Sequence, residues 1–255
     1  MAFSYGGISL EKLLAQMNAV TFNSFLDIIT PTLDFNPGPV GNVPIEEVNN
    51  NVSEELVIEN ISASKDDWDS FENSWDFKKH PLLRNISTIS EAFAQWQAEC
   101  DDRFNKLKAN EEELNHIFID IYGLQDELTP EVEDKDVTVR KADLQRDIKS
   151  LLSYAVGCMF GRYSLDVEGL AYAGGEWDSS KYQSYIPDAD NVIPITDEEY
   201  LDDDIVSRLC AWLKVVYGAD TLEANLDYIA KALGNKGSTS REIIRNYFLN
   251  DFFKD

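Results

Sequence analysis

Hydrophobic residues recur at helical spacing over most of the chain, beginning with the stretch from Leu10 to Ile29. Within this stretch the apolar side chains stand mostly three or four positions apart, which is typical of a helix that buries one face. Ser9 precedes the run as an N-cap candidate, and Pro31 follows it as a residue that cannot continue a helix. The pattern therefore predicts one helix over residues 10–29.

The helical periodicity is interrupted in the next segment. Residues 30–35 are β-prone, residues 37–39 read Pro-Gly-Pro, and Val43-Pro44-Ile45 follows. Proline fixes its own backbone angle and glycine is permissive, so the central cluster predicts a turn. We expect a short strand at residues 30–35 and a turn before Val43-Pro44-Ile45.

Four aromatic residues, Trp68, Phe71, Trp75 and Phe77, follow a connecting helix that the pattern predicts over residues 52–64. In an acidic stretch of this kind they could stack on nucleic-acid bases, as aromatic residues do in single-strand binders. They could equally anchor the segment to the helical part of the chain. Because no basic residue is interleaved with them, we favour the anchor and expect Trp68 and Trp75 to be buried.

From Pro81 onward the chain is rich in helix-forming residues, and the apolar spacing predicts a mainly α-helical domain. Gly123 and the pair Gly157 and Gly161 have special places in it: the first ends a predicted helix, and the other two allow close backbone approach. The predicted helices cover residues 90–107, 111–122, 143–160, 202–217, 221–233 and 240–253.

The composition excludes some classes of protein. Twenty-two Lys and Arg residues stand against 47 Asp and Glu residues in a chain of 255, giving a formal net charge of -25. Such a field repels phosphate backbones and acidic membranes, so the chain taken alone predicts a poor nucleic-acid binder. No apolar run reaches the roughly 20 residues that a membrane span needs, and we expect no membrane partner. Cys100, Cys158 and Cys210 lie far apart, which fits buried packing positions and a cytoplasmic protein.

Catalytic, cofactor-binding and metal-binding sites have no candidates in the sequence. His80 and His116 belong to separate predicted elements, which argues against a metal centre. The acidic run at residues 197–204 could hold magnesium in a nuclease, but consecutive carboxylates point in different directions. Capping of a helix by Thr196 or Asp202 explains the run better. Cys158 stands in an apolar run without a nearby histidine, so we interpret it as a packing residue.

Basic residues are few, and five of them are the candidates for contact with nucleic acid: Lys78, Lys79, Arg84, Arg140 and Lys141. The first three cluster after the tryptophans, and the last two precede the helix predicted over residues 143–160. Such groups could contact phosphates and fix the position of a DNA-binding enzyme along the duplex without reading the DNA sequence. Pairing with the surplus of carboxylates inside the chain is the alternative that we favour.

The most specific stretch of the sequence is LLSYAVGCMFGRYSLD at residues 151–166, continued at residues 169–178 by GLAYAGGEWD. It resembles the C-terminal region of PglX-type adenine-specific DNA methyltransferases of BREX phage-defence systems, which are related to Type IIG restriction-modification enzymes. Residues 30–45 resemble the end of the target-recognition domain in that family, with Thr30 in place of the family's asparagine. The glycine-rich S-adenosylmethionine loop and the Asn-Pro-Pro-Tyr/Phe motif of the family do not occur in the chain.

The resemblance implies a non-catalytic C-terminal fragment that supports DNA target recognition or docks a partner. It predicts the end of the target-recognition domain, a small α+β remnant, at residues 1–50. A connecting helix with the aromatic anchor follows at 51–80, and a helical C-terminal domain at 81–255. The implied partners are the remainder of the parent methyltransferase, duplex DNA in the full enzyme, and other BREX proteins. S-adenosylmethionine is implied for the parent only, and both ends indicate a piece of a longer protein.

The net charge by itself also fits a different class of function. An acidic interaction module could imitate DNA and occupy the DNA site of a partner, and a net charge of -25 supports this alternative. Mimicry would require carboxylates spaced like phosphates on one face, and a sequence does not determine that arrangement.

Overall fold

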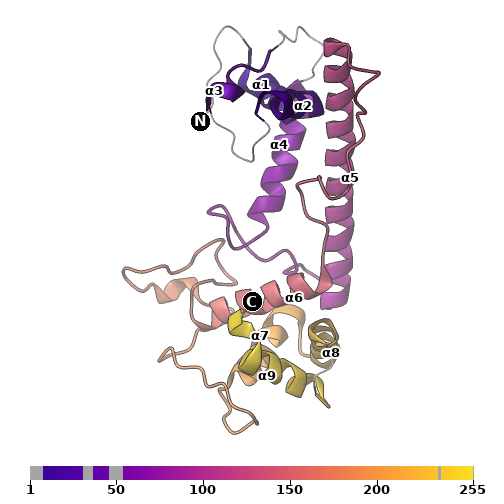
Figure 1. Ribbon diagram of the computed structural model, residues 1–255. Helices are drawn as coiled ribbons and strands as arrows, with labels where there is room; N and C mark the ends of the chain where they lie inside the picture. The colour runs from indigo at the N-terminus through magenta and orange to yellow at the C-terminus, as the bar shows by residue number, and fades with distance from the viewer. Residues whose placement is uncertain (1–7, 31–36, 46–53, 235–236, 255) are drawn as a thin grey trace. The chain divides into compact units, whose positions relative to one another are not determined.

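The structure is a computed structural model that describes residues 8–30, 37–45, 54–234 and 237–254. The chain divides into two compact units, each made of two stretches of sequence. Unit 1 consists of Met1–Asp67 and Asp102–Arg140, and unit 2 of Trp68–Asp101 and Lys141–Asp255. The described part is mainly helical, as predicted, and contains no β-strand (Figure 1). The α+β character expected of residues 1–50 therefore finds no support there, although residues 31–36 of the expected strand lie outside the described residues.

Unit 1 begins with two helices where the sequence predicted one. The first, α1 (Leu10–Asn18), starts at Ser9, whose side chain accepts a hydrogen bond from the backbone N–H of Lys12, so the predicted N-cap is confirmed. Ala19 is extended, with ψ at 150°, and α2 (Val20–Ile29) follows it. The Asn115 side chain accepts the backbone N–H of Val20 at 2.9 Å. A contact from far along the chain thus caps α2, which is why periodicity alone did not locate the break.

Two more helices follow α2. Residues 37–40, where a turn was predicted, form the single helical turn α3 (Pro37–Val40). The connecting helix is α4 (Glu54–Asp69), five residues longer at its end than predicted. The core of the unit is made of side chains from these helices and from residues 102–140: Ala15, Phe22, Leu26, Val57, Phe104, Leu107, Leu114 and Phe118.

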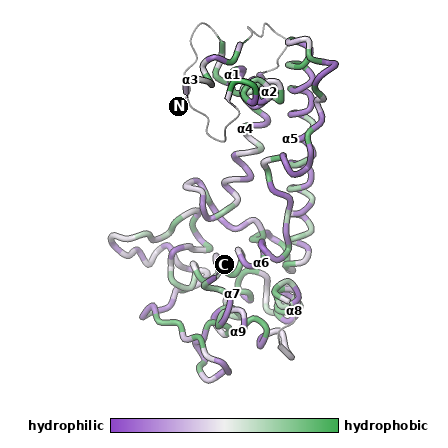
Figure 2. Tube along the Cα trace, viewed as in Figure 1, coloured by the Kyte–Doolittle hydropathy of each residue, from purple (hydrophilic) through white to green (hydrophobic). Residues whose placement is uncertain are grey.

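The long helix α5 (Ile89–Tyr122) replaces two helices predicted over residues 90–107 and 111–122. Its first part belongs to unit 2 and its remainder to unit 1. The residues between the two predicted helices are Lys108-Ala109-Asn110, and none of them breaks a helix. The interruption in apolar spacing at this point therefore does not end α5. The alternation of hydrophobic and hydrophilic positions along α5 can be followed in Figure 2. Gly123, with φ at +67°, ends the helix as predicted.

Unit 2 is built around α6 (Leu144–Met159), α7 (Ile205–Tyr217), α8 (Leu222–Leu233) and α9 (Ser240–Asn250), with short 3-10 helices at Ser179–Lys181 and Phe252–Lys254. The four α-helices contact one another and enclose one core, which also includes the first part of α5. Its largest fully buried side chains include Trp212, Tyr154, Tyr163 and Phe248. Asp143 caps α6 through the N–H of Arg146, and Asp204, not Thr196 or Asp202, caps α7.

The aromatic anchor is only partly as predicted. Trp75 is 101% exposed and Trp68 is 50% exposed, so the expectation that both are buried is wrong. The Ser74 side chain donates to Asp69 and accepts from the N–H of Asp76, and this turn leaves Trp75 outside the core. Phe77 is the buried member of the set. Stacking of the tryptophans on bases was the alternative to the anchor, and the structure does not test it.

We expect His80 to make the stability of unit 2 dependent on pH. Its Nδ1 accepts the backbone N–H of Leu82 at 3.3 Å, and burial lowers the pKa of His80 from 6.5 to about 3. Below pH 6.5 the unfolded chain binds a proton at His80, whereas the folded chain binds one only near pH 3. The free energy of unfolding therefore decreases as the pH falls from about 6.5 toward 3. From pH 7.5 to 5.5 the free energy of unfolding should drop by about 1.4 kcal/mol on this account.

Urea denaturation followed by tryptophan fluorescence measures this effect in unit 2, because all five tryptophans belong to that unit. The variant His80→Asn serves as the control, since it keeps a polar side chain that does not titrate. We expect its loss of stability between the two pH values to be smaller by about 1.4 kcal/mol. Equal losses in both proteins would contradict the assignment.

Candidate functional site

The five basic residues proposed to contact nucleic acid are divided between the two units. Arg140 belongs to unit 1, and Lys78, Lys79, Arg84 and Lys141 belong to unit 2. The ammonium group of Lys78 lies 3.5 Å from the carboxylate of Glu168, and both side chains are about 70% exposed. Lys79 and Lys141 are also exposed. Exposed pairs of this kind are weak, so Lys78 remains available to another anion.

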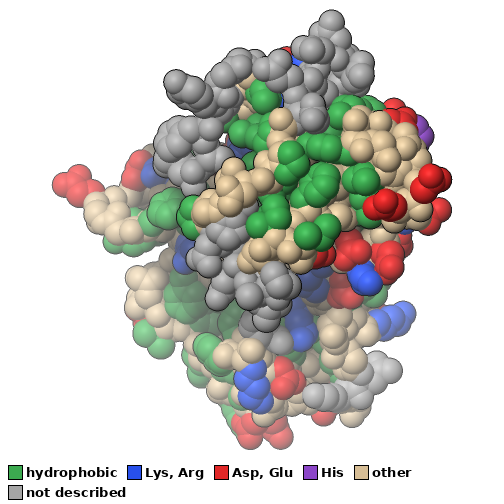
Figure 3. Space-filling view, turned by 45° about the horizontal axis from the view of Figure 1, so that its top comes forward, with side chains coloured by type: hydrophobic (Ala, Val, Ile, Leu, Met, Phe, Trp, Pro, Cys, Tyr) green, Lys and Arg blue, Asp and Glu red, His purple; other side chains and the backbone are tan. Residues whose placement is uncertain are grey.

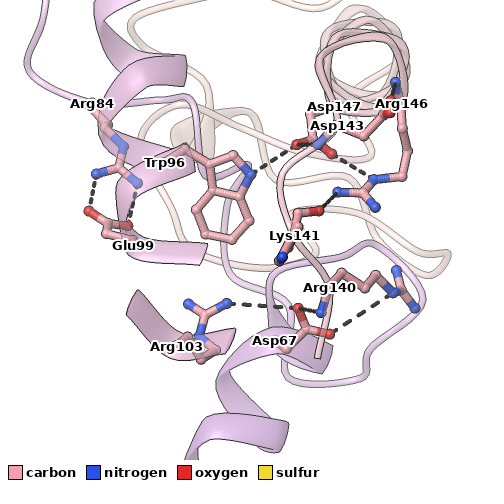
Figure 4. A network of polar contacts seen from close by, with 10 residues as sticks. All are labelled: Asp67, Arg84, Trp96, Glu99, Arg103, Arg140, Lys141, Asp143, Arg146 and Asp147. Carbon is pink, nitrogen blue, oxygen red and sulfur yellow. Dashed lines mark hydrogen bonds and ion pairs between the residues drawn. The ribbon is translucent and has the colours of Figure 1, made fainter. Parts of the chain in front are cut away.

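Arg84 is held more firmly by a carboxylate. Its two terminal nitrogens donate to the two oxygens of Glu99 at 2.5 and 2.7 Å, and its Nε donates to the carbonyl of Pro81 at 2.8 Å. The hydrogen bond to Glu99 raises the pKa of Arg84. A guanidinium that already makes a bidentate pair offers few donors to a phosphate. Arg84 therefore has a structural role in unit 2 (Figure 4).

Arg140 helps to surround a buried carboxylate in unit 1. Asp67, 5% exposed, accepts the backbone N–H of Arg140 at 3.1 Å, and the guanidinium of Arg140 lies 3.9 Å from its other oxygen. Arg103 of α5 approaches the same carboxylate at 3.8 Å. Two cations around one buried anion indicate a packing interaction. Contact of the five basic residues with nucleic acid stays a prediction.

A second buried carboxylate, Asp147 on α6, organises part of unit 2. It is 2% exposed and accepts hydrogen bonds from the indole N–H of Trp96, the backbone N–H of Asp143 and the Nε of Arg146, at 3.0, 3.1 and 2.8 Å. Arg146 also donates to the carbonyl of Lys141 at 2.9 Å. The network joins α5 to α6 (Figure 4). Sequence reasoning missed it because nothing local distinguishes Asp147 from the many solvated acids of the chain.

The stretch at residues 151–178, singled out in the sequence, is a packing motif. Trp177 stacks on Tyr182 with ring centroids 4.6 Å apart, and the Tyr182 hydroxyl donates to the carbonyl of Gly161 at 2.5 Å. Gly161 has φ at +75°, and a Cβ there would lie 2.7 Å from the Trp177 ring. The predicted close approach at Gly161 is therefore confirmed.

A groove of about 570 Å³ lies in unit 1 and was not predicted from the sequence. Its walls come from α1, α2, α4, α5 and residues 131–138, elements far apart in the chain. Apolar side chains such as Leu14, Val57 and Ile61 share it with carboxylates such as Glu111 and Asp136. No local pattern marks a surface assembled from five separate segments, and only the folded unit brings these side chains together.

The described residues contain no group of three or more His, Cys, Asp and Glu side chains that could hold a metal ion. Cys100, Cys158 and Cys210 are free thiols, the first two buried, and burial raises the pKa of Cys158 to about 12. A thiol with so high a pKa is protonated at neutral pH and is a poor nucleophile. Among the helices that the structure describes, none has the length and apolar character of a membrane span.

Comparison with known proteins relates almost the whole chain to enzymes of one kind. It is 53% identical over 261 aligned residues to the adenine-specific methyltransferase PglX of Lacticaseibacillus casei (strain Zhang), which covers 99% of this chain and 22% of that protein. It is 32% identical over 276 residues to the adenine-specific methyltransferase BrxX of Escherichia coli O9:H4 (strain HS), covering 97% of this chain and 23% of that protein. No family model matches the chain.

The chain is thus related to one segment of adenine-specific methyltransferases, and the resemblance to the PglX type that the sequence indicated is confirmed. It spans less than a quarter of the length of the two curated relatives.

Proposed function

We propose that the chain is a non-catalytic, C-terminal segment of an adenine-specific DNA methyltransferase, and that it docks onto the remainder of the enzyme and supports DNA target recognition. The observation that carries the proposal is the alignment of 99% of the chain with only 22% of the PglX relative. The methyl-transfer chemistry is proposed to lie in the larger remainder. There S-adenosylmethionine would be bound and adenine flipped out of the duplex for methylation at N6.

The electrostatics favour support through protein contacts. A net charge of -25 opposes the approach of a phosphate backbone, and Arg84 and Arg140 already pair with Glu99 and Asp67. In this case the segment would support DNA recognition by holding the recognition domain in place. The segment itself would make few contacts with phosphates. Other BREX proteins are further candidates for a docking partner.

Two measurements test the proposal. Calorimetric titration of the isolated chain with S-adenosylmethionine should show no saturable binding, and anisotropy with a labelled duplex should show no affinity tighter than about 1 μM at physiological salt. Removing the aligned segment from the Lacticaseibacillus casei relative should leave its cofactor binding intact and lower adenine methylation of DNA at least about tenfold. Retained cofactor binding shows that the shortened enzyme is folded.

Two results would contradict the proposed function. A micromolar, saturable cofactor isotherm with the isolated chain would place part of the catalytic apparatus in this segment. Unchanged methylation by the shortened relative would remove the supporting role.

The acidic-module alternative is favoured by the charge of -25 alone. It predicts that the chain competes with duplex DNA for a DNA-binding partner, whereas docking within the enzyme predicts no such competition.

A further inference from the structure

Several apolar side chains that line the groove in unit 1 are left partly exposed by the described residues. Leu14 of α1 is 44% exposed and Ile61 of α4 is 41% exposed, and both line the groove. Leu10, one turn before Leu14, is 56% exposed. Figure 3 shows hydrophobic side chains gathered over the part of unit 1 that α1 and α2 build. Apolar surface left in water loses the stabilisation that burial gives, and a rimmed apolar groove is typical of a binding surface.

The charges of the groove all have one sign. Glu111, Glu131 and Asp136 line it, and none of its described lining residues is Lys or Arg. Glu111 is half-buried, and burial raises the pKa of its carboxyl. Its carboxylate makes no hydrogen bond or ion pair with the residues that the structure describes. A partly desolvated carboxylate without a cation is stabilised by a partner that brings one.

We propose that this groove docks a segment from the remainder of the parent methyltransferase, in which apolar side chains stand next to a lysine or arginine. The inference rests on the proposed function, because it takes the docking partner to be the rest of the enzyme. About four fifths of the Lacticaseibacillus casei relative lies outside the aligned stretch, which is ample chain to supply such a segment. The apolar side chains contact Leu14 and Ile61, and the cation pairs with Glu111.

The size of the groove suits this occupant. A volume of about 570 Å³ lies within the range of roughly 300–1,000 Å³ found for ligand pockets. Four helices, α1, α2, α4 and α5, contribute to its walls. An amphipathic segment recognised between helices presents a few apolar anchors and sets its register with a charge. The partner chemistry is therefore apolar and basic, which also complements the net charge of the chain.

The test uses the full 255-residue chain and the part of the Lacticaseibacillus casei relative outside the aligned stretch, purified separately. Their dissociation constant is measured by calorimetry for the parent chain and for two pairs of variants. Glu111→Lys is paired with Glu113→Lys, an exposed acid on the same helix that does not line the groove. Leu14→Asp is paired with Ile28→Asp, which is 79% exposed on α2 and also outside the groove. Circular dichroism checks that each variant keeps its helical content.

We expect Glu111→Lys and Leu14→Asp to weaken binding at least about tenfold, because each places a repelling or poorly solvated charge against the docked segment. The two control variants should change the dissociation constant less than about twofold. If the parent chain binds and all four variants bind equally well, the groove is not the docking surface, although the docking role stands. If the parent chain does not bind the remainder at all, the groove proposal and the docking role both fail.

Discussion

Replacing Arg245 with methionine should cost unit 2 about 3–5 kcal/mol of its free energy of unfolding, because the change leaves the carboxylate of Asp204 buried without its cation. Asp204 is 0% exposed and Arg245 is 5% exposed, and their charged groups lie 2.5 Å apart. Arg245 also donates to the carbonyl and hydroxyl of Thr196 at 3.1 and 3.2 Å. One side chain thus joins α9, the cap of α7 and the loop that precedes α7.

Urea denaturation followed by tryptophan emission measures this loss, since Trp212 is fully buried in the same core. Arg241→Met is the matched control on the same helix. Arg241 makes a bidentate pair with Glu223, but its side chain is 40% exposed, and we expect no change beyond the error of the midpoint.

A second variant separates the loss of the ion pair from a general disturbance of packing. Asp204→Ser combined with Arg245→Met removes both charges and keeps a hydroxyl that can cap α7 through the N–H of Ser207. The double variant should be more stable than Arg245→Met alone, because no unpaired charge stays buried. A single variant within about 1 kcal/mol of the parent would show that the pair is not buried in solution.

The substitution Gly157→Ala should destabilise unit 2 by about 1–3 kcal/mol through overpacking. A Cβ on Gly157 would lie 2.5 Å from the ring of Tyr163. That ring cannot move aside easily: it is 2% exposed, it stacks on Tyr154 with centroids 4.8 Å apart, and its hydroxyl donates to Glu72 at 3.1 Å. The cost is steric, since alanine otherwise favours a helix.

A double-mutant cycle identifies the cause. In the background of Tyr163→Leu, the smaller side chain leaves room for the added methyl group, and Gly157→Ala should cost less than it does in the parent chain. Thermal or urea unfolding followed by tryptophan fluorescence gives all four stabilities. Additive losses in the two backgrounds would contradict a clash with Tyr163.

The ends of several helices could be predicted because their signals are local. Ser9 and Asp143 cap α1 and α6 through side-chain contacts three residues along, and Gly123 ends α5 with a positive φ. These interactions require only a few neighbouring residues, so the sequence contains all the information. The predicted division of the chain near residues 50 and 80 concerns the parent enzyme and stays a prediction.

The errors have two physical origins. The break at Ala19 is accompanied by the cap that Asn115 provides to Val20, 95 residues away in the chain, which no local pattern shows. The exposure of Trp75 accompanies a local turn in which the Ser74 side chain donates to Asp69. The hydrophobicity of an aromatic residue does not by itself show whether the fold buries it. The absence of interleaved basic residues therefore did not indicate burial of Trp68 and Trp75, and Phe77 is the buried aromatic residue of the set.

By itself the sequence determined the helical class of the protein, several helix ends and the relationship to PglX-type methyltransferases, because propensity, capping and motif identity are properties of short stretches. Only the tertiary structure decided which acids are buried and which basic residues are paired. Asp147 and Asp204 look like the other acids in sequence, yet the core surrounds them. The groove of unit 1 likewise exists only when α1, α2, α4 and α5 meet, since no single segment contains its walls.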